Sequence, residues 1–176
     1  MKKVILVGHS QAGTVMPRMA ELRPDLFKRL VYVSCPSPLA GGTISEMIGN
    51  CLHGQSDTEV GWPTDPATSS PEERYRIMFC NDMAPEQANL FIQSLGCDAW
   101  PASSYCERNW RYDHLATVPT SYVIFLKDMS LPAVWQERFA GRFHADRVIR
   151  IDAGHQGMIT RPHALAEVLL AESLVR

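Results

Sequence analysis

Short apolar runs alternate with amphipathic stretches near both ends of the chain, and this alternation is lost in the middle. Four runs rich in β-branched and other apolar residues predict strands, and the first of them is apolar on both faces, as a central strand of a parallel sheet would be. The predicted strands cover residues 3–7, 29–34, 120–126 and 147–151. The stretches between them place apolar side chains at helical spacing. This order of elements predicts an α/β fold with a mostly parallel sheet and flanking helices.

The helix predicted after the first strand has a proline within it. Its apolar positions recur at helical spacing between Ala12 and Leu22. Pro17 falls inside this pattern, so we expect a kink or a weakened turn there, because proline has no backbone N–H to donate. Two further helices are predicted at residues 132–143 and from Pro162 onward. The strand, helix and strand at the start of the chain predict a right-handed βαβ unit.

Residues 36–115 are the part of the chain in which the alternation is broken. Prolines and glycines recur through this segment and interrupt any long hydrophobic period. Two helices are predicted within it, at residues 71–79 and 85–95. We interpret the segment as an inserted cap of short helices and loops, within a single domain that covers residues 1–176. The alternative interpretation is a set of irregular surface loops.

The residues between the first predicted strand and helix carry the candidate chemistry. We interpret the segment from Gly8 to Gly13 (Gly-His-Ser-Gln-Ala-Gly) as a G-x-S-x-G pattern, whose glycines leave room for a sharp turn. Such a turn would hold Ser10 in a strained backbone conformation with its hydroxyl exposed. The backbone N–H of Gln11 would then donate a hydrogen bond to a developing oxyanion. The alternative is a tight turn whose serine does no chemistry.

Polar residues follow three of the predicted strands in the order Ser10, Asp128 and His155. In an open α/β sheet the ligand site lies beyond the carboxyl ends of the strands, so the fold would bring these residues together. The order favours a triad in which His155 takes the proton of Ser10 and Asp128 orients the imidazole. Asp128 could instead only cap the next helix, and His155 could be an ordinary loop residue.

Other acidic residues are weaker candidates for the acid of the triad. Asp152 lies three residues before His155 and is interpreted as a hydrogen-bonding group of the loop. Three more lie in or beside the predicted cap, namely Asp82, Asp98 and Asp113.

Three residues are candidates for contact with a substrate. His9 precedes the predicted nucleophile, although a role as a packed neighbour of Ser10 is as consistent with its position. Trp100 and Trp110 are among the cap residues that would supply an apolar pocket, together with Trp62, Met78, Phe79 and Phe91. The other histidines show no metal-ligand spacing, so we expect no metal site and no cofactor.

Charge, cysteine content and the lengths of the apolar runs argue against several classes of protein. The formal net charge of −2 and the absence of basic runs argue against a nucleic-acid partner. The 5 cysteines are odd in number and form no C-x-x-C pair, which predicts reduced thiols in a cytoplasmic protein. The first apolar run is too short for a signal peptide, and no segment approaches the roughly 20 apolar residues of a membrane span.

Several motifs together resemble the α/β-hydrolase superfamily, and within it the branch of plant hydroxynitrile lyases, methyl esterases and bacterial esterase relatives. These motifs are Val7-Gly8-His9-Ser10-Gln11-Ala12-Gly13, Phe79-Cys80-Asn81-Asp82 with Pro85-Glu86, Lys127-Asp128-Met129-Ser130-Leu131-Pro132, and Asp152-Ala153-Gly154-His155. The segment around Asp128 is the most specific of them, because this branch carries its acid just before a similar Leu-Pro. The resemblance covers nearly the whole chain.

The chain also departs from the pattern of this superfamily. Its members carry four strands and a helix before the nucleophile strand, so the resemblance implies a truncated α/β-hydrolase fold of about four strands. It also implies that the loop which completes the oxyanion hole is missing. Gln156 stands where the lyases have a lysine that handles cyanide, which favours ester or thioester hydrolysis over cyanohydrin cleavage.

The leading hypothesis is therefore a carboxylesterase that acts on a small apolar or aromatic ester through an acyl-enzyme. A catalytically weak or non-hydrolytic member, used for binding or for a cyclisation, is the second hypothesis. A half-enzyme that a separate chain completes is the third. Because the nucleophile strand would be an open apolar edge, we expect a homodimer or a complex with a partner that supplies the missing part.

Overall fold

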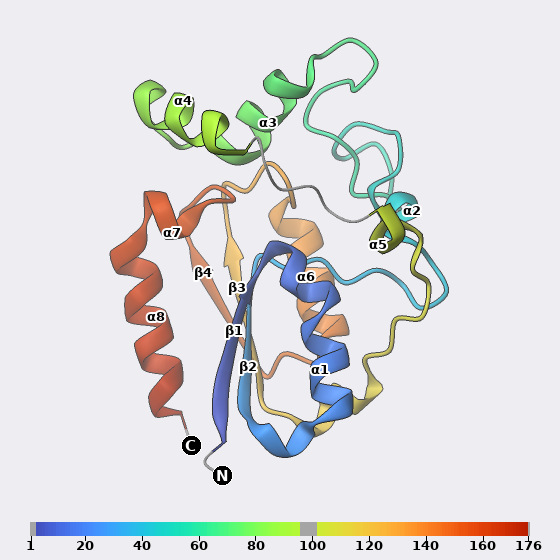
Figure 1. Ribbon diagram of the computed structural model, residues 1–176, viewed down its shortest axis with the longest axis vertical. Coiled ribbons are helices and arrows are strands. Elements are labelled where there is room, and N and C mark those ends of the chain that lie inside the picture. Colours follow the sequence, from blue (N-terminus) through green and yellow to red (C-terminus); the bar gives the residue numbers. More distant parts are fainter. Residues whose placement is uncertain (1–2, 96–101, 176) are drawn as a thin grey trace.

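The computed structural model describes residues 3–95 and 102–175, and its centre is one parallel sheet of 4 strands in the order β1-β2-β3-β4 (Figure 1). The strands are β1 (Val4–His9), β2 (Phe27–Val33), β3 (Thr120–Phe125) and β4 (Arg147–Ile151). Each strand pairs in parallel with the next one along the chain. The α/β fold class predicted from the sequence is confirmed.

Helices lie in the connections between the strands and after the last strand. Those beside the sheet are α1 (Met16–Leu22), α6 (Ala133–Arg142), α7 (Gly157–Thr160) and α8 (Pro162–Leu174), with short 3-10 helices at η1 (Ser10–Thr14), η2 (Pro24–Leu26) and η4 (Asp113–Thr117). The others are α2 (Ile44–Ile48), α3 (Pro71–Cys80), α4 (Pro85–Ser94) and α5 (Ala102–Cys106). In the part of the chain that the structure describes, none of these helices combines the length and the apolar character that crossing a bilayer requires.

The two faces of the sheet pack against different helices. Alternate residues of β2 and β3 point to opposite faces, and both sets are buried. The prediction that the first strand is a central strand buried on both faces is wrong, because β1 lies at the edge of the described sheet and is only partly buried. Helices α1 and α6 cover one face and α8 covers the other (Figure 1). On the first face the core includes Leu30, Tyr32, Tyr122, Phe139 and Phe143. On the second face it includes Val31, Val33, Val123, Phe125 and Leu165.

Strand β1 forms one edge of the sheet. Within the described residues its strand neighbour is β2, and its other side meets no strand. Two of its side chains, Val4 and Val7, are 53% and 43% exposed. An edge that lacks charged side chains is a template for pairing with another strand, so the self-association expected from the sequence stays a prediction.

The turn after β1 differs from the expected helix in one respect. Residues Ser10–Thr14 form a 3-10 helix, and α1 begins only at Met16. Pro17 therefore lies in the first turn of α1, where a backbone N–H has no intrahelical partner and its loss costs nothing. The kink that we expected at Pro17 is wrong for this reason.

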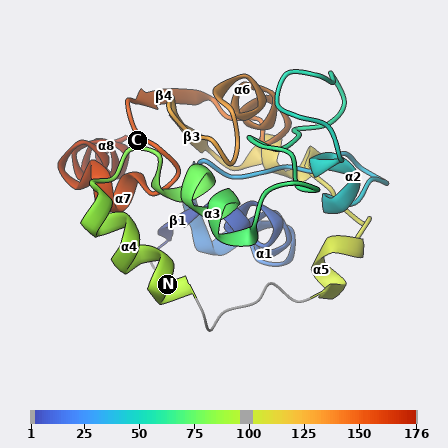
Figure 2. The same cartoon turned by 90° about the horizontal axis from the view of Figure 1, so that it is seen from above.

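The segment between β2 and β3 lies over the carboxyl ends of the strands. Helices α3 and α4 occupy the positions at which the sequence predicted helices, and the view from above shows α3 crossing over the sheet (Figure 2). A capping box fixes the start of α3, because Ser70 and Glu73 each bond the other's backbone N–H. This arrangement places a helical cap directly above the candidate catalytic residues.

Candidate active site

Ser10 is held at the tip of the sharp turn between β1 and the following helix. Its φ angle is 51°, in the left-handed region that non-glycine residues rarely occupy. A Cβ atom at Gly8 would collide with the side chains of Ala12 and Met16, and one at Gly13 would collide with the carbonyl oxygen of Pro36. The chain therefore needs both glycines to turn this tightly, and the turn presents the Ser10 hydroxyl at the carboxyl end of the sheet.

The spacing of this turn corrects one detail of the sequence interpretation. In G-x-S-x-G the second glycine stands two residues after the serine, but Ala12 occupies that position here and Gly13 follows it. The small methyl group of Ala12 packs against Gly8, which has no side chain to obstruct it. The motif is thus G-x-S-x-A-G, and the turn still forms.

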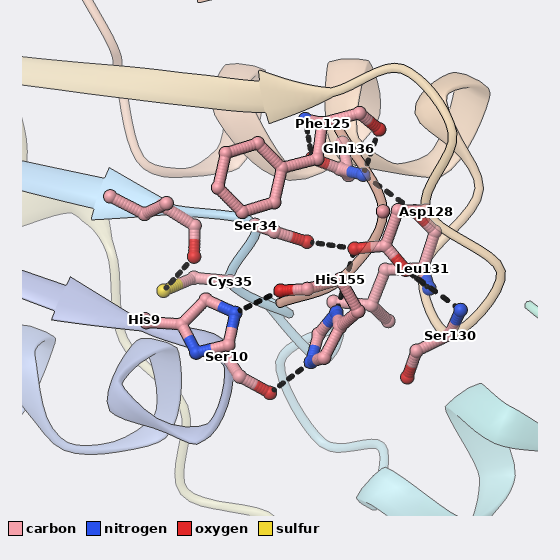
Figure 3. Close-up of polar contacts among 12 residues, drawn as sticks. His9, Ser10, Ser34, Cys35, Phe125, Asp128, Ser130, Leu131, Gln136 and His155 are labelled. Carbon is pink, nitrogen blue, oxygen red and sulfur yellow. Dashed lines mark hydrogen bonds and ion pairs between the residues drawn. The ribbon is translucent and has the colours of Figure 1, made fainter. Parts of the chain in front are cut away.

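Ser10, His155 and Asp128 are joined by two hydrogen bonds (Figure 3). The Oγ atom of Ser10 lies 2.9 Å from Nε2 of His155. The Nδ1 atom of His155 lies 2.6 Å from Oδ2 of Asp128. Because a carboxylate only accepts, Nδ1 carries a proton in this bond, which leaves Nε2 as the nitrogen that can accept the Ser10 proton. The structure therefore brings together the three residues that the sequence selected.

Asp128 is almost completely buried, and four hydrogen bonds satisfy its carboxylate. Oδ2 accepts from His155 at 2.6 Å and from the Ser34 hydroxyl at 2.5 Å. Oδ1 accepts from the backbone N–H groups of Ser130 and Leu131 at 2.7 and 2.8 Å. Burial by itself would raise the pKa of Asp128, but His155 and these donors outweigh it and lower the pKa. The acid is therefore ionised at neutral pH.

Ser34 is a site residue that the sequence analysis missed. It directly follows β2 and has a φ angle of 42°, so it shares the strained conformation of Ser10. Its hydroxyl donates to the same oxygen of Asp128 that accepts from His155. The signal was present in the sequence, because Ser34 is also a polar residue at the carboxyl end of a strand.

Gln136 fixes the loop that carries Asp128. This fully buried side chain from α6 accepts a hydrogen bond from the backbone N–H of Phe125 at 3.0 Å. Its amide group donates to the carbonyl oxygens of Phe125 and Leu131 at 3.1 and 2.6 Å. Phe125 pairs with Ile151 of β4, whereas the pairing of β3 with β2 ends at Val123. Gln136 thus bonds the backbone of Phe125 beyond the end of that pairing and closes the loop of residues 126–131.

His9 packs against the candidate general base. Its Nε2 atom lies 2.8 Å from the carbonyl oxygen of His155, and since a carbonyl only accepts, Nε2 carries the proton. The two imidazole rings are 4.7 Å apart. Burial, with the neighbouring His155, lowers the pKa of His9 from 6.5 to about 3. His9 is therefore neutral at physiological pH, and its contact with a substrate stays a prediction.

The other candidates for substrate contact and oxyanion binding occupy different places. The indole N–H of Trp110 donates to the carbonyl oxygen of Gly42 at 2.9 Å, and its ring lines a cavity of about 230 Å³ between α1 and residues 107–112. Ser10 and His155 are not among the residues that line this cavity. Trp100 lies outside the described residues. Gln11 follows Ser10 in η1, as the elbow requires, and its role as an oxyanion donor stays a prediction.

One of the cap residues expected to supply an apolar pocket, Phe79, lies beside the triad. The ring of Phe79, in α3, is 5.4 Å from the ring of His155. Tyr75 and Phe91 pack on Phe79 at ring distances of 5.9 and 6.5 Å. The cap thus presents an aromatic group next to the Ser10–His155 pair.

The alternative acids are not placed to serve the triad. Asp152 is 63% exposed and pairs with Lys127 at 2.6 Å on the surface. Asp113 opens η4, close to the amino end of β3 and away from its carboxyl end. Asp82 bonds to the backbone of the loop that carries His155. Asp98 lies outside the described residues.

In residues 3–95 and 102–175 the structure gathers no group of three or more histidine, cysteine, aspartate or glutamate side chains that could hold a metal ion, and the expectation of no metal site stays a prediction. The arrangement at the carboxyl ends of the strands offers a hydroxyl, an imidazole and an ionised acid in series. Such a series can activate the hydroxyl as a nucleophile.

Comparison with known proteins matches nearly the whole chain to one family. A family model described as "Alpha/beta hydrolase family" matches residues 1–168. Polyneuridine aldehyde esterase of Rauvolfia serpentina is 23% identical over 190 residues, which cover 96% of this chain and 69% of that protein.

Two solved structures show the same fold. One is an extracellular alpha/beta-hydrolase from a Paenibacillus species, with a TM-score of 0.74 at 20% identity, covering 97% of this chain and 72% of that one. The other is a methylesterase from Arabidopsis, with a TM-score of 0.67 at 22% identity, covering 98% and 70%. These relatives are longer than the present chain.

Proposed function

The chain belongs to the alpha/beta hydrolase family, and we propose that it is a serine hydrolase of the carboxylesterase type. The observation that carries this proposal is the pair of hydrogen bonds from Ser10 to His155 and from His155 to Asp128, at 2.9 and 2.6 Å. A serine that served only to turn the chain would not need a buried, ionised acid behind its histidine partner.

The proposed reaction has two halves. Ser10 Oγ attacks the ester carbonyl while Nε2 of His155 takes the hydroxyl proton, and Asp128 stabilises the imidazolium. The backbone N–H of Gln11 donates to the oxyanion of the tetrahedral intermediate. When this intermediate collapses, the imidazolium gives its proton to the departing alkoxide, which leaves as an alcohol. Water then attacks the acyl-enzyme by the same proton route, releasing the carboxylic acid and restoring Ser10.

The neutral state of His9 supports this reaction. A positive charge on His9, whose ring is 4.7 Å from that of His155, would disfavour the imidazolium that forms in each half. Burial prevents that charge, because it lowers the pKa of His9 to about 3. The charge of the imidazolium then faces Asp128 without a competing cation from this side.

We infer that the substrate is a small apolar or aromatic ester. The ring of Phe79 beside His155, with Tyr75 and Phe91 packed on it, offers an apolar surface to the acyl or alcohol group. The names of two relatives, an esterase and a methylesterase, agree with an ester as the substrate class. Trp110 contributes to a separate cavity, so we do not assign it to this surface.

The test is the hydrolysis of a short-chain aryl ester by the wild-type chain and by Ser10→Ala. We expect the variant to keep its fold and lose turnover by about 10⁶-fold, because the nucleophile is gone. Equal rates in the two proteins would show that Ser10 is not the nucleophile. A wild-type chain without activity toward a panel of such esters would instead favour the non-hydrolytic alternative.

We also propose that the chain self-associates through β1 and works in the cytoplasm. Exposed Val4 and Val7 on an edge strand support the first proposal. Free thiols at Cys35, Cys51, Cys80 and Cys106 support the second. Sedimentation at micromolar concentration tests the association, and a monomer would contradict it. Cell fractionation tests the location, and recovery of the protein outside the cytoplasm would contradict it.

A further inference from the structure

One short cap segment touches both loops that carry the acid and the base. It consists of Asn81 and Asp82, which directly follow α3. We propose that these two residues form a clamp that sets the distance between the Asp128 loop and the His155 loop, and so act as positioning residues for the triad. This inference rests on the proposed function.

Asn81 holds the acid side of the clamp. Its Nδ2 atom donates to the carbonyl oxygen of Lys127 at 2.8 Å. Lys127 is the residue before Asp128, so a shift of this carbonyl moves the acid directly. The contact joins residues 46 positions apart in the sequence.

Asp82 holds the base side. Its Oδ2 atom accepts from the backbone N–H of Gly154 and from the hydroxyl of Thr160, both at 2.8 Å. Gly154 is the residue before His155, and Thr160 ends α7. One carboxylate oxygen thus ties the start of the histidine loop to the helix that follows it.

Asn81 and Asp82 pack tightly against Gly154. A Cβ atom at Gly154 would clash with the side-chain oxygens of both Asn81 and Asp82. The two clamp residues therefore lie directly against the histidine loop, and Gly154 is required for them to come so close. Phe79, at the end of the same helix, packs its ring against His155.

The clamp matters because the triad depends on small distances. The bonds from His155 to Asp128 and from Ser10 to His155 are 2.6 and 2.9 Å, and neither survives a large shift of one loop. A misplacement of about 1 Å costs on the order of 100-fold in rate. Because the clamp residues belong to the cap, a displacement of α3 would reach both loops at once.

Two further links join the same loops, namely a backbone hydrogen bond from the N–H of Lys127 to the carbonyl oxygen of Ala153 at 2.9 Å and a surface ion pair. The ion pair provides a matched control. Lys127 and Asp152 form an ion pair at 2.6 Å, but their side chains are 49% and 63% exposed. Exposed pairs contribute little to holding a geometry, because water and salt screen them. Lys127→Ala removes this link and leaves the Lys127 carbonyl that Asn81 contacts. The control thus separates the clamp from any general effect of joining the two loops.

The experiment measures ester hydrolysis as a function of pH for the wild type, Asn81→Ala, Asp82→Ala, Asp82→Asn and Lys127→Ala. We expect kcat to fall by on the order of 100-fold in Asp82→Ala and in Asn81→Ala, with a smaller change in KM. Asp82→Asn keeps an acceptor oxygen and should recover most of the rate. Lys127→Ala should behave as the wild type.

The pH profile separates positioning from a loss of folded protein. Asp128 and the neutral His9 are the titratable groups that face His155. If the loops separate, the imidazolium loses part of its stabilisation by Asp128, so the acidic limb of the kcat/KM profile should move to lower pH. A mere loss of folded protein lowers the whole profile without moving the limb.

Two outcomes would overturn the clamp. One is a wild-type kcat and pH profile in folded Asp82→Ala and Asn81→Ala. The other is a loss of rate in Lys127→Ala equal to that in Asp82→Ala. A fluorophosphonate that labels wild-type Ser10 while both clamp variants react at the wild-type rate would defeat the clamp and leave the proposed function standing. Absence of wild-type labelling would defeat both.

Discussion

Two buried polar clusters occupy opposite ends of the same sheet. The cluster at the carboxyl ends consists of Ser10, Ser34, Asp128 and His155, and we call it the catalytic cluster after the role proposed for it. The amino-end cluster consists of Arg29, Ser121, Asp146, Arg147 and Glu172, near the starts of β2, β3 and β4 and the end of α8. Both clusters bury a carboxylate, yet only the first has the features of a reactive site.

The amino-end cluster is fully paired, and all its members except Asp146 lie in strands or in α8. Glu172 is 1% exposed and accepts from Arg147 at 2.9 Å and from the hydroxyl of Ser121. Arg29 donates to Ser121 at 2.9 Å and to Asp146 at 2.7 Å. Each charge faces an opposite charge, so the cluster joins α8 to three strands and leaves no group that could react with a ligand.

The catalytic cluster differs in its backbone and in its last member. Ser10 and Ser34 have φ angles of 51° and 42°, whereas Arg29, Ser121 and Arg147 lie in strands. The series from Asp128 ends at the Ser10 hydroxyl, which lies under the cap instead of against another charge. A buried charge that is paired with an opposite charge therefore indicates a role in stability. A strained backbone, together with a series of hydrogen bonds that ends at a hydroxyl under the cap, indicates a reactive site.

The largest difference between the clusters should appear in Asp128→Asn. We expect kcat for ester hydrolysis to fall by about 10⁴-fold, because the amide would hold the imidazole in the wrong tautomer. Steady-state kinetics at constant pH measure this change. Asp152→Asn is the matched control and should keep the wild-type rate, since Asp152 pairs with Lys127 on the surface. A greater loss in Asp152→Asn would move the acid to that residue.

Glu172→Gln tests the other cluster and should show the opposite pattern. The change leaves two arginines beside a neutral group, and removing one partner of a buried ion pair costs about 3 kcal/mol of the free energy of unfolding. Urea unfolding followed by circular dichroism measures this cost. The kcat of the folded fraction should match the wild type. A variant with full stability and reduced kcat would contradict the claim that the amino-end cluster serves stability and the catalytic cluster serves the reaction.

A smaller effect concerns the pH dependence of stability near the catalytic cluster. The folded protein lowers the pKa of His9 from 6.5 to about 3, so between these values the unfolded chain binds a proton that the folded chain does not. Stability should therefore fall as the pH is lowered through this window, by up to about 1.4 kcal/mol per pH unit.

His9→Gln sharpens this test. Glutamine can still donate to the His155 carbonyl but does not titrate, so this part of the slope should vanish in the variant. Urea unfolding at about pH 7, 6, 5 and 4 gives the free energy of unfolding of the two proteins across the pH range in which only the unfolded chain binds the proton. Identical slopes would show that His9 is not held neutral by burial.

Much of the fold and the triad could be predicted because their signals are local. Apolar runs mark β2 and β3, which are buried on both faces, and a parallel sheet collects the residues that follow its strands at one edge. This rule selects Ser10, Asp128 and His155 from positions far apart in the chain, and it would also have selected Ser34.

The supporting residues could not be predicted because they act across the fold. Gln136 lies on the buried face of α6, where periodicity leads one to expect an apolar residue. Asn81 and Asp82 reach the two catalytic loops only because the cap folds back over the sheet. Glu172 meets Arg29 and Arg147 only when α8 packs on its face. These contacts depend on tertiary structure, which sequence spacing does not encode.

The central claim is that Ser10 is an activated nucleophile, and covalent labelling tests it most directly. A fluorophosphonate reacts with such a hydroxyl by forming a P–O bond to the serine while fluoride leaves. The account predicts that peptide mass spectrometry of the labelled wild-type chain places the adduct on Ser10, and that Ser10→Ala gives no adduct. An adduct on a different residue, or an unlabelled wild-type protein that is folded and pure, would contradict the account.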